Sequence, residues 1–286
     1  MLRLHEDRER FGEALNFTEA ETNFPARLVE KDYFCTVILE YLAMQVPGLV
    51  FKGGTCLAKI HANFFRLSED LDFVIPVTNG SARSDRRKLI APVKVAFAGL
   101  PGVSPCFRIS QPLEGANNST QYVGSLGYQS LPTGQPELIT IEVALREPLL
   151  RPPIPAEART ALLNPLTERD MVEPVSVRCI SKLEAFAEKF RAALSRREVA
   201  ARDFCDLDYA VRNLGLRADD AQLIGLVRQK LAVAGNAPVD VSEGRLRELR
   251  QKTEPQLRPV LRPRDFAEFD LPRAFRLVAV MAAKVR

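Results

Sequence analysis

The sequence predicts an α+β protein in which an N-terminal α/β half precedes a helical C-terminal half. Helical and strand-like hydrophobic patterns alternate over residues 1–150, whereas the chain beyond residue 155 carries almost only helical spacing. A proline-rich segment at 148–155 has the composition of a linker. We therefore expect two domains, 1–150 and 151–286.

Hydrophobic spacing predicts the N-terminal elements in chain order. A helix is expected over 24–44, where apolar residues recur at three- and four-residue intervals. The apolar run 49–51 predicts a short buried strand, a glycine turn follows at 52–55, and the next residues, 56–60, have a helical pattern. A second strand is expected over 68–76.

Within this second strand the two-residue period separates two faces. Leu71 and Phe73 lie on one face, and Asp70 and Asp72 share the other. Two carboxylates are therefore expected to point in the same direction from one strand.

The remaining elements are predicted from similar patterns. A basic helix is expected over 83–98 and a strand over 138–145. Ser181 and Glu184 form a capping-box pattern that opens a helix, and a further helix is expected from about 203 to 214.

Composition favours a protein that works in the cytoplasm. Hydrophobic residues make up 46% of the chain and charged residues 27%, as in ordinary globular proteins. No apolar run approaches the ~20 residues that cross a bilayer, and the first residues lack the apolar core of a signal peptide. We expect no membrane partner.

Positive charge is concentrated near the C-terminus. The net charge is +4, but residues 245–286 alone contain 11 Lys/Arg and 5 Asp/Glu. Clustered cations suit a polyanion such as RNA, and a solvated helical surface would explain them equally well.

The cysteines and histidines give no pattern of a metal site. Five cysteines without a CxxC pair predict neither a disulfide framework nor a zinc site, and two histidines make a histidine-based site unexpected. A catalytic metal would then be held by carboxylates, whose oxygens favour Mg²⁺ or Mn²⁺.

The first candidate site combines a glycine turn with the paired aspartates. Lys52-Gly53-Gly54-Thr55 follows a predicted strand, and adjacent glycines let the backbone approach phosphate oxygens closely. Ser68, Asp70 and Asp72 come after a short helix, and two aspartates on one strand face can bind the same metal. Paired glycines alone are common in turns and an Asp-x-Asp pair alone is common on solvated strands, whereas the two together predict nucleotidyl transfer. The glycines do not have the Gly-x-x-x-x-Gly-Lys-Ser/Thr spacing of a P-loop.

Three more acidic groups and a lysine extend the candidate set. Glu142 lies in an apolar strand, where it would be either a third metal ligand beside Asp70 and Asp72 or a solvated residue. Lys189 lies on a largely apolar helix, and Asp203 and Asp206 are one turn apart on the next. This lysine could bind phosphate, although by itself the pattern favours an interhelical salt bridge.

At these residues the chain resembles the AbiEii/AbiGii toxin family of nucleotidyltransferases. The matching motifs are Glu30-Lys31-Asp32-Tyr33-Phe34, Lys52-Gly53-Gly54-Thr55-x-Leu57, Arg66-x-Ser68-x-Asp70-x-Asp72-Phe73, Ala187-Glu188-Lys189-Phe190-Arg191-Ala192 and Arg202-Asp203-x-x-Asp206-Leu207.

The resemblance implies a DNA polymerase β-like nucleotidyltransferase domain with a mixed sheet, followed by a helical domain. It implies Mg²⁺ held by Asp70 and Asp72, with Glu142 as a weaker match, and NTP as substrate. Nucleotide contacts are implied for the residues of the turn and for three others: Lys52, Gly53, Gly54, Thr55, Ser68, Lys189 and Asp203. Catalytic roles are implied for Asp70, Asp72, Lys189 and Asp206. Asp206 is preferred to Asp203 as the later motif aspartate.

Similar proteins transfer a nucleotide to an acceptor hydroxyl, in some cases at the 3′ end of tRNA, and so stop translation. The resemblance also implies a cognate antitoxin protein. Two alternatives remain: transfer to a protein or small-molecule acceptor, and a non-catalytic module that binds RNA or an antitoxin. Residues 79–136 match no motif.

Overall fold

The computed structural model describes all 286 residues and divides them into two compact units, Met1–Ile180 and Ser181–Arg286. Each unit is described by itself. The boundary falls later than the expected one after residue 150, because the chain from 151 to 180 contributes two strands to the sheet of the first unit.

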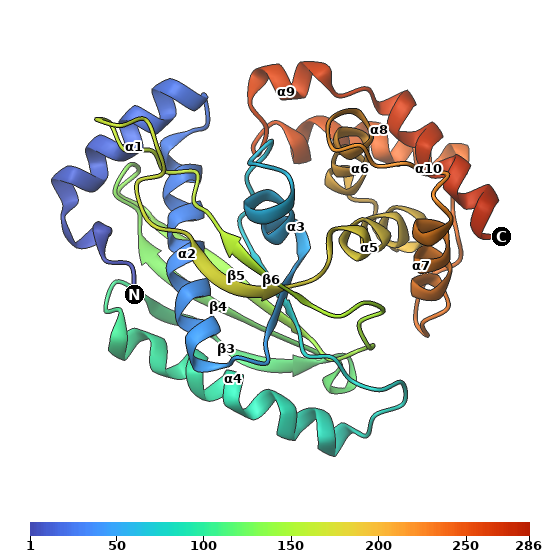
Figure 1. Cartoon of the computed structure of the whole chain (residues 1–286), viewed down its shortest axis with the longest axis horizontal. Helices are drawn as coiled ribbons and strands as arrows, with labels where there is room; N and C mark the ends of the chain where they lie inside the picture. Colours follow the sequence, from blue (N-terminus) through green and yellow to red (C-terminus); the bar gives the residue numbers. More distant parts are fainter. The chain divides into compact units, whose positions relative to one another are not determined.

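Unit 1 is built on one mixed sheet of seven strands in the order β3-β4-β5-β2-β1-β7-β6 (Figure 1). Three central pairings define it: β1 runs antiparallel to β2, while β2 with β5 and β1 with β7 are parallel. The strands are β1 (Val50–Lys52), β2 (Leu71–Val74), β3 (Arg108–Ala116), β4 (Gln121–Gln129), β5 (Pro136–Ala144), β6 (Ile154–Ala158) and β7 (Val175–Cys179).

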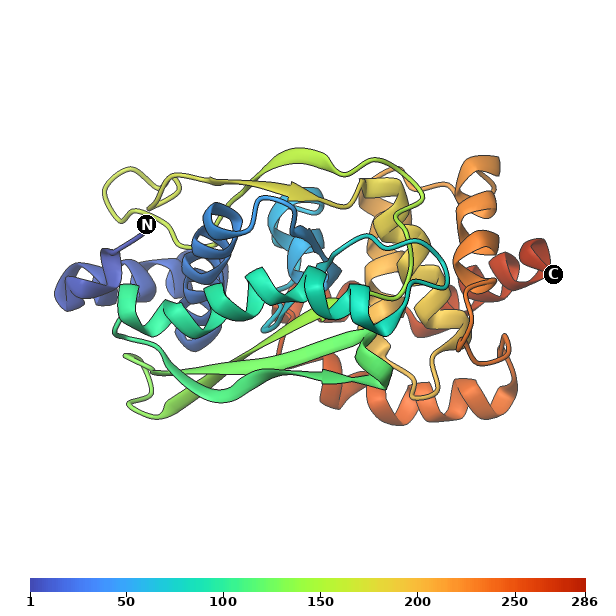
Figure 2. The same ribbon diagram turned by 90° about the horizontal axis from the view of Figure 1, so that it is seen from below.

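Helices and short turns of unit 1 connect and cover these strands. α4 runs alongside β3 and β4 (Figure 2), and α2 packs against α1, α4 and β7. The elements are η1 (Leu4–Glu6), α1 (Arg8–Thr22), α2 (Ala26–Gln45), α3 (Gly53–Cys56), the π-helical η2 (Leu57–His61), α4 (Arg83–Val103) and η3 (Asn117–Ser119).

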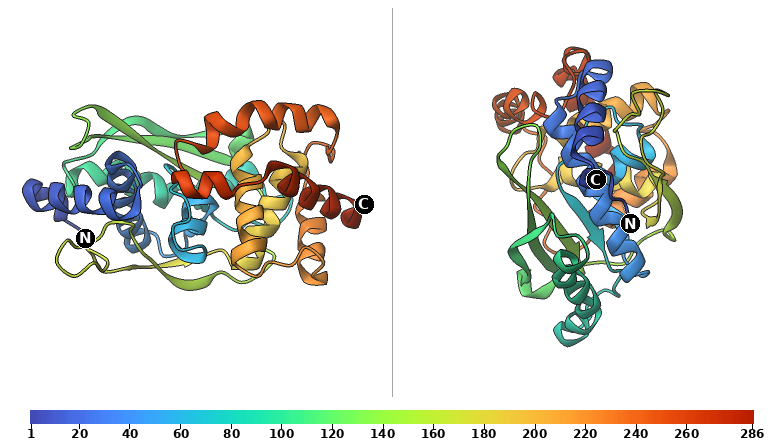
Figure 3. Two further views of the ribbon diagram at one scale, coloured as in Figure 1. Left: turned by 90° about the horizontal axis from the view of Figure 1, so that it is seen from above. Right: turned by 90° about the vertical axis from the view of Figure 1, so that its left-hand side faces the viewer.

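Unit 2 consists of helices, drawn from yellow to red in Figure 3, without a strand among them. They are α5 (Lys182–Ser195), α6 (Ala201–Asn213), α7 (Ala221–Leu231), α8 (Glu243–Leu257), α9 (Pro263–Glu268) and α10 (Leu271–Val285). The Ser181 hydroxyl accepts a hydrogen bond from the Glu184 backbone N–H, which confirms the predicted helix start.

The α+β prediction is confirmed, and most predicted elements are present. The helix expected at 24–44 is α2, the strand expected at 138–145 is β5, and α6 matches the helix expected at 203–214. The prediction of helix beyond residue 155 was wrong for β6 and β7, which pair with each other as antiparallel strands. Buried and exposed residues alternate along β7 but not along β6. None of the helices has the length and apolar character needed to cross a bilayer.

A buried ion pair fixes η2 against α2 in unit 1. The Lys59 ammonium donates to Asp32 Oδ1 at 2.6 Å and to the Thr36 hydroxyl at 2.8 Å, and both charged side chains are at most 1% exposed. The second carboxylate oxygen of Asp32 accepts the Ala161 backbone N–H at 2.9 Å. The pair therefore joins three segments that are distant in sequence.

Replacing Lys59 by alanine should destabilise unit 1 strongly. Asp32 would remain buried without its cation, a loss that typically costs about 3–5 kcal/mol. Arg217→Ala removes an ion pair with Asp219 that is largely exposed on both sides and should leave stability unchanged. Chemical denaturation compares the two variants; equal midpoints would contradict the role of the buried pair.

Candidate active site

Gly53 brings the turn after β1 directly onto Asp72. Its φ of +77° lies in the left-handed region, and a Cβ at this position would sit 1.9 Å from Asp72 Oδ2. Both conditions demand glycine, since any side chain would overlap the carboxylate and strain the backbone. The turn and the second aspartate are therefore neighbours.

Gly54 lies against two polar side chains of the segment that precedes β2. A Cβ there would be 2.8 Å from Arg66 Nη2 and 3.1 Å from Ser68 Oγ. Arg66 is buried, and its Nη1 donates to the Leu67 carbonyl at 3.1 Å. The structure thus places the predicted Ser68 beside the turn and adds a guanidinium that the sequence indicated only as part of a motif.

Thr55 secures the first aspartate through the backbone. Its hydroxyl donates a hydrogen bond to the Asp70 carbonyl oxygen, so the hydroxyl hydrogen is used inside the protein. The turn after β1 consequently touches the Asp-x-Asp segment at Thr55, Gly54 and Gly53. The sequence prediction that turn and aspartates form one site agrees with this geometry.

Strand register places a third carboxylate beside Asp72. Asp72 is the Cα partner of Lys52 on β1 and of Glu142 on β5. Directly opposite residues on neighbouring strands, which lie about 4.8 Å apart, point to the same face of the sheet. The strand expected over 68–76 covers only Leu71–Val74, so Asp70 lies just before β2, and its place on the same face stays a prediction from the sequence.

These carboxylates have the chemistry that Mg²⁺ or Mn²⁺ requires. Asp70, Asp72 and Glu142 are each partly exposed, and all three supply hard oxygen ligands. The backbone of the glycine turn lies directly against the Asp72 carboxylate, so a phosphate held by this backbone would be close to an ion held by the carboxylates. The residues present therefore fit a divalent metal.

A network on α2 supports the segment leading to Asp70. Arg27 and Lys31 both contact Glu69, at 3.1 and 3.3 Å, and both also contact Glu137 on β5. The Lys31 side chain is buried and lies between these two carboxylates. The Glu30–Phe34 motif, which supported only the family resemblance, thus has a structural role beside the candidate site.

The second candidate group lies within unit 2 and forms a salt bridge. The Lys189 ammonium contacts Asp203 Oδ1 at 2.9 Å and Asp206 Oδ2 at 2.8 Å, and Arg196 also reaches Asp203 at 3.2 Å. The interhelical ion pair between α5 and α6, the alternative favoured by the pattern alone, is therefore present. The nucleotide role implied for these residues stays a prediction.

A third cluster of potential metal ligands was not predicted from the spacing of residues along the sequence. Cys56 at the end of α3, His61 at the end of η2 and Cys179 at the end of β7 place their ligand atoms within 4.8 Å of one another. Cys56 and His61 are five positions apart, but Cys179 is more than a hundred positions further on, so only the pairing of β1 with β7 brings the three together.

The fold and this arrangement are those of a nucleotidyltransferase: a mixed sheet, a glycine turn and an Asp-x-Asp strand beside it. The chain belongs to the nucleotidyl transferase AbiEii toxin family of type IV toxin–antitoxin systems. The model of this family matches residues 42–276.

Two solved structures share the fold. MenT4, a nucleotidyltransferase toxin from Mycobacterium tuberculosis H37Rv, superimposes with a TM-score of 0.51 at 18% identity, over 96% of this chain and 99% of MenT4. JHP933 from Helicobacter pylori gives 0.51 at 15% identity, over 92% and 93% of the two chains. No curated protein sequence matches this chain.

Gly53→Ala should disrupt the candidate site, whereas Gly48→Ala should not. The first variant combines a positive φ, which costs about 1–3 kcal/mol for a residue with a side chain, with a collision against Asp72. Gly48 has ordinary backbone angles and nothing within 4 Å of an added Cβ. Thermal unfolding of both variants checks this, and a Gly53→Ala protein as stable as the Gly48→Ala protein would contradict the close contact.

Proposed function

We propose that this chain is a toxin that transfers a nucleotide from NTP, with Mg²⁺ or Mn²⁺, to an acceptor hydroxyl at the 3′ end of tRNA, and so blocks translation. Asp70 and Asp72 are the catalytic carboxylates, and Glu142 is a third metal ligand. Lys52, Gly53, Gly54, Thr55 and Ser68 form the nucleotide side of the site in unit 1. We also propose a cognate antitoxin as partner and the cytoplasm as location.

One observation carries the catalytic part of this proposal: the turn at Gly53 contacts the carboxylate of Asp72. Nucleotidyl transfer needs a surface that holds phosphates and carboxylates that hold a cation at the same place. A backbone without Cβ atoms lets phosphate oxygens approach N–H groups closely. Arg66, beside Gly54, adds positive charge next to that turn.

In the reaction, the acceptor oxygen forms a bond to the α-phosphorus as the bond to pyrophosphate breaks. When bound, the cation would neutralise phosphate charge and favour ionisation of the attacking hydroxyl. The chain's own groups orient the substrates: the glycine turn receives the phosphates, and Thr55 holds the backbone of Asp70 in position. In unit 2, the family role proposed for Lys189 and Asp206 would require the lysine to exchange carboxylate contacts for phosphate contacts.

Charge in unit 2 favours an RNA acceptor. Several cations of the basic C-terminal stretch are engaged within the unit: Arg273 pairs with Asp208, and Arg245 donates to two backbone carbonyls. Arg247 and Arg250, one turn apart on α8, are exposed. Such residues can contact phosphates without breaking an internal ion pair.

Asp72→Asn and Asp70→Asn should each reduce transfer by about 10²–10³-fold, because each loses a negative charge that holds the cation at the reacting phosphates while keeping the side-chain shape. The assay incubates full-length protein with total tRNA, Mg²⁺ and each of four α-³²P-labelled NTPs, followed by a denaturing gel. Asp219→Asn, at an exposed ion pair, is the matched control and should label normally.

Full labelling by both aspartate variants would refute the assignment of the catalytic carboxylates. Absence of a labelled tRNA band with any nucleotide, from folded protein that binds NTP, would instead favour a protein acceptor or a small molecule. The same labelled mixture added to a cell lysate then identifies which class of acceptor is modified. Failure to bind Mg²⁺–NTP at all would favour a non-catalytic module.

Arg247→Ala combined with Arg250→Ala should weaken tRNA binding in proportion to the number of RNA phosphates that these two arginines neutralise. For an RNA acceptor, the negative slope of log affinity against log salt becomes shallower by about one for each phosphate that is no longer neutralised. Arg217→Ala, another exposed arginine of unit 2, is the control. A salt slope that is near zero in the unmodified protein would rule out RNA binding through phosphates and support a neutral acceptor.

A further inference from the structure

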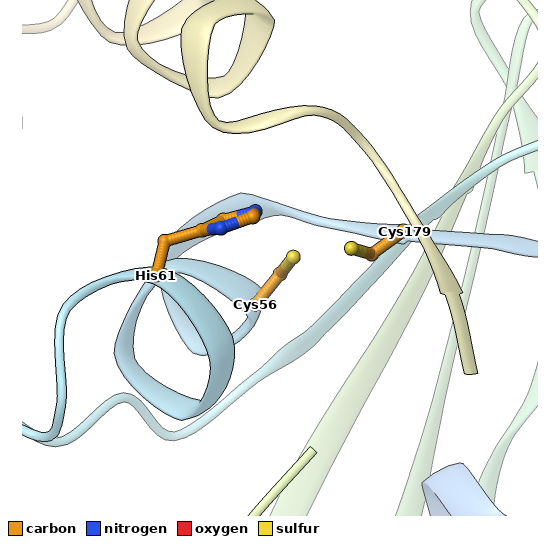
Figure 4. A group of neighbouring side chains, drawn as sticks. All are labelled: Cys56, His61 and Cys179. Atoms are coloured by element: carbon orange, nitrogen blue, oxygen red, sulfur yellow. The ribbon is translucent and has the colours of Figure 1, made fainter. Parts of the chain in front are cut away.

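Two thiols and one imidazole from separate segments meet inside unit 1. Figure 4 shows Cys56 and Cys179 with their sulfur atoms directed towards each other, and the ring of His61 beside them. One ligand atom from each residue lies within 4.8 Å of the other two. Neither the proposed transfer reaction nor the sheet core requires this combination of side chains.

A backbone hydrogen bond defines the state of the His61 ring. His61 Nε2 lies 3.0 Å from the Ile180 carbonyl oxygen. A carbonyl oxygen can only accept, so Nε2 carries the hydrogen and donates it. In the neutral ring the lone pair is then on Nδ1. Metal-binding histidines usually donate one ring N–H to a carbonyl or carboxylate and ligate through the other nitrogen, so a metal site here requires Nδ1 as the ligand atom.

Burial alone does not distinguish the cysteines of this cluster from the other buried cysteine of unit 1. Cys35 on α2 is fully buried, and desolvation raises the pKa of its thiol to about 12. Cys179 is equally inaccessible, yet its neighbours are a second thiol and an imidazole, and its sulfur shares a hydrogen bond with the Cys56 thiol. Cys179 therefore differs from Cys35 in having two potential metal ligands beside it.

We propose that Cys56, His61 and Cys179 bind one thiophilic divalent cation of the Zn²⁺ class. Zinc–sulfur bonds of about 2.3 Å and zinc–nitrogen bonds of about 2.0–2.1 Å in a tetrahedron place the ligand atoms roughly 3.5–3.8 Å apart. From separations of up to 4.8 Å, the three atoms need to close by at most about 1.0–1.3 Å to reach this geometry. A water molecule completes the fourth position.

The charges balance at this site. Binding releases the protons of the two thiols, and two thiolates with a neutral imidazole cancel the charge of the cation. Sulfur and nitrogen ligands select zinc-like ions, whereas the carboxylates at Asp70 and Asp72 select Mg²⁺ or Mn²⁺. The two sites of unit 1 therefore differ in the metal they prefer.

A cation bound at this location would connect elements of unit 1 and so affect the stability of the unit. Cys56 follows Thr55, whose hydroxyl holds the Asp70 carbonyl, and Cys179 ends β7, which pairs with β1 at Phe51. A cation bound here links the helix after the glycine turn to β7. It should raise the thermal stability of unit 1.

The test titrates reduced, metal-free, full-length protein with Co²⁺, a spectroscopic substitute for Zn²⁺. Thiolate ligation produces a near-ultraviolet charge-transfer band, which carboxylates do not give, so the Asp70–Asp72 site does not contribute. We expect one Co²⁺ per chain, displacement by one Zn²⁺, and a higher melting temperature with Zn²⁺.

Variants assign the band to residues. Cys56→Ala and Cys179→Ala should each abolish it, and His61→Gln, at a partly exposed position, should weaken Co²⁺ binding at least tenfold. Cys35→Ala, which removes an equally buried thiol of the same unit, should keep full binding. Circular dichroism establishes that each variant is folded; should a cysteine variant not fold, His61→Gln decides.

Three results would overturn the proposal. One is a reduced, folded protein that shows no thiolate band. Another is a band that persists in folded Cys56→Ala or is unchanged in His61→Gln. The third is a Cys56–Cys179 disulfide in the isolated protein whose reduced form binds no Co²⁺, which would identify a redox pair instead.

Discussion

The contact between Gly53 and Asp72 is the constraint on which the candidate site depends. It exists because β1 and β2 pair antiparallel with Lys52 opposite Asp72, so the residue after Lys52 must pass over the Asp72 carboxylate. Only a residue without a side chain can do so at a φ of +77°. Both the closeness of the turn to the aspartates and the glycine requirement follow from this single pairing.

Buried charges hold the surrounding elements in that register. Asp32 and Lys31, neighbours on α2, engage Lys59 on η2 and Glu69 next to Asp70, respectively. An unpartnered charge at such positions would be costly, and together the pairs connect α2 to two segments between the glycine turn and β2. We infer that the polar residues of this otherwise apolar helix serve to position the site.

In unit 2, the Lys189 salt bridge illustrates how one geometry is compatible with two roles. A lysine held by two carboxylates on a neighbouring helix stabilises the packing of α5 and α6. The same arrangement keeps the ammonium charged and in a defined position, which a phosphate-binding lysine also needs. Stability and ligand binding are thus alternative uses of the same charge.

The sequence by itself determined the local features: α2 and β5 follow from short-range periodicity, and the start of α5 follows from the capping box at Ser181. It also predicted the glycine turn and the aspartates as one site, since their motif lies within about twenty residues. Tertiary structure decided the strand pairings, because hydrogen bonding between strands is non-local. Only these pairings set Glu142 beside Asp72, add β6 and β7 to the sheet of unit 1, and bring Cys179 to Cys56 and His61. Asp72 and Glu142 are 70 positions apart and Cys56 and Cys179 are 123 apart. Residues so distant leave no periodic signal in the chain, so their meeting depends on the folded sheet alone.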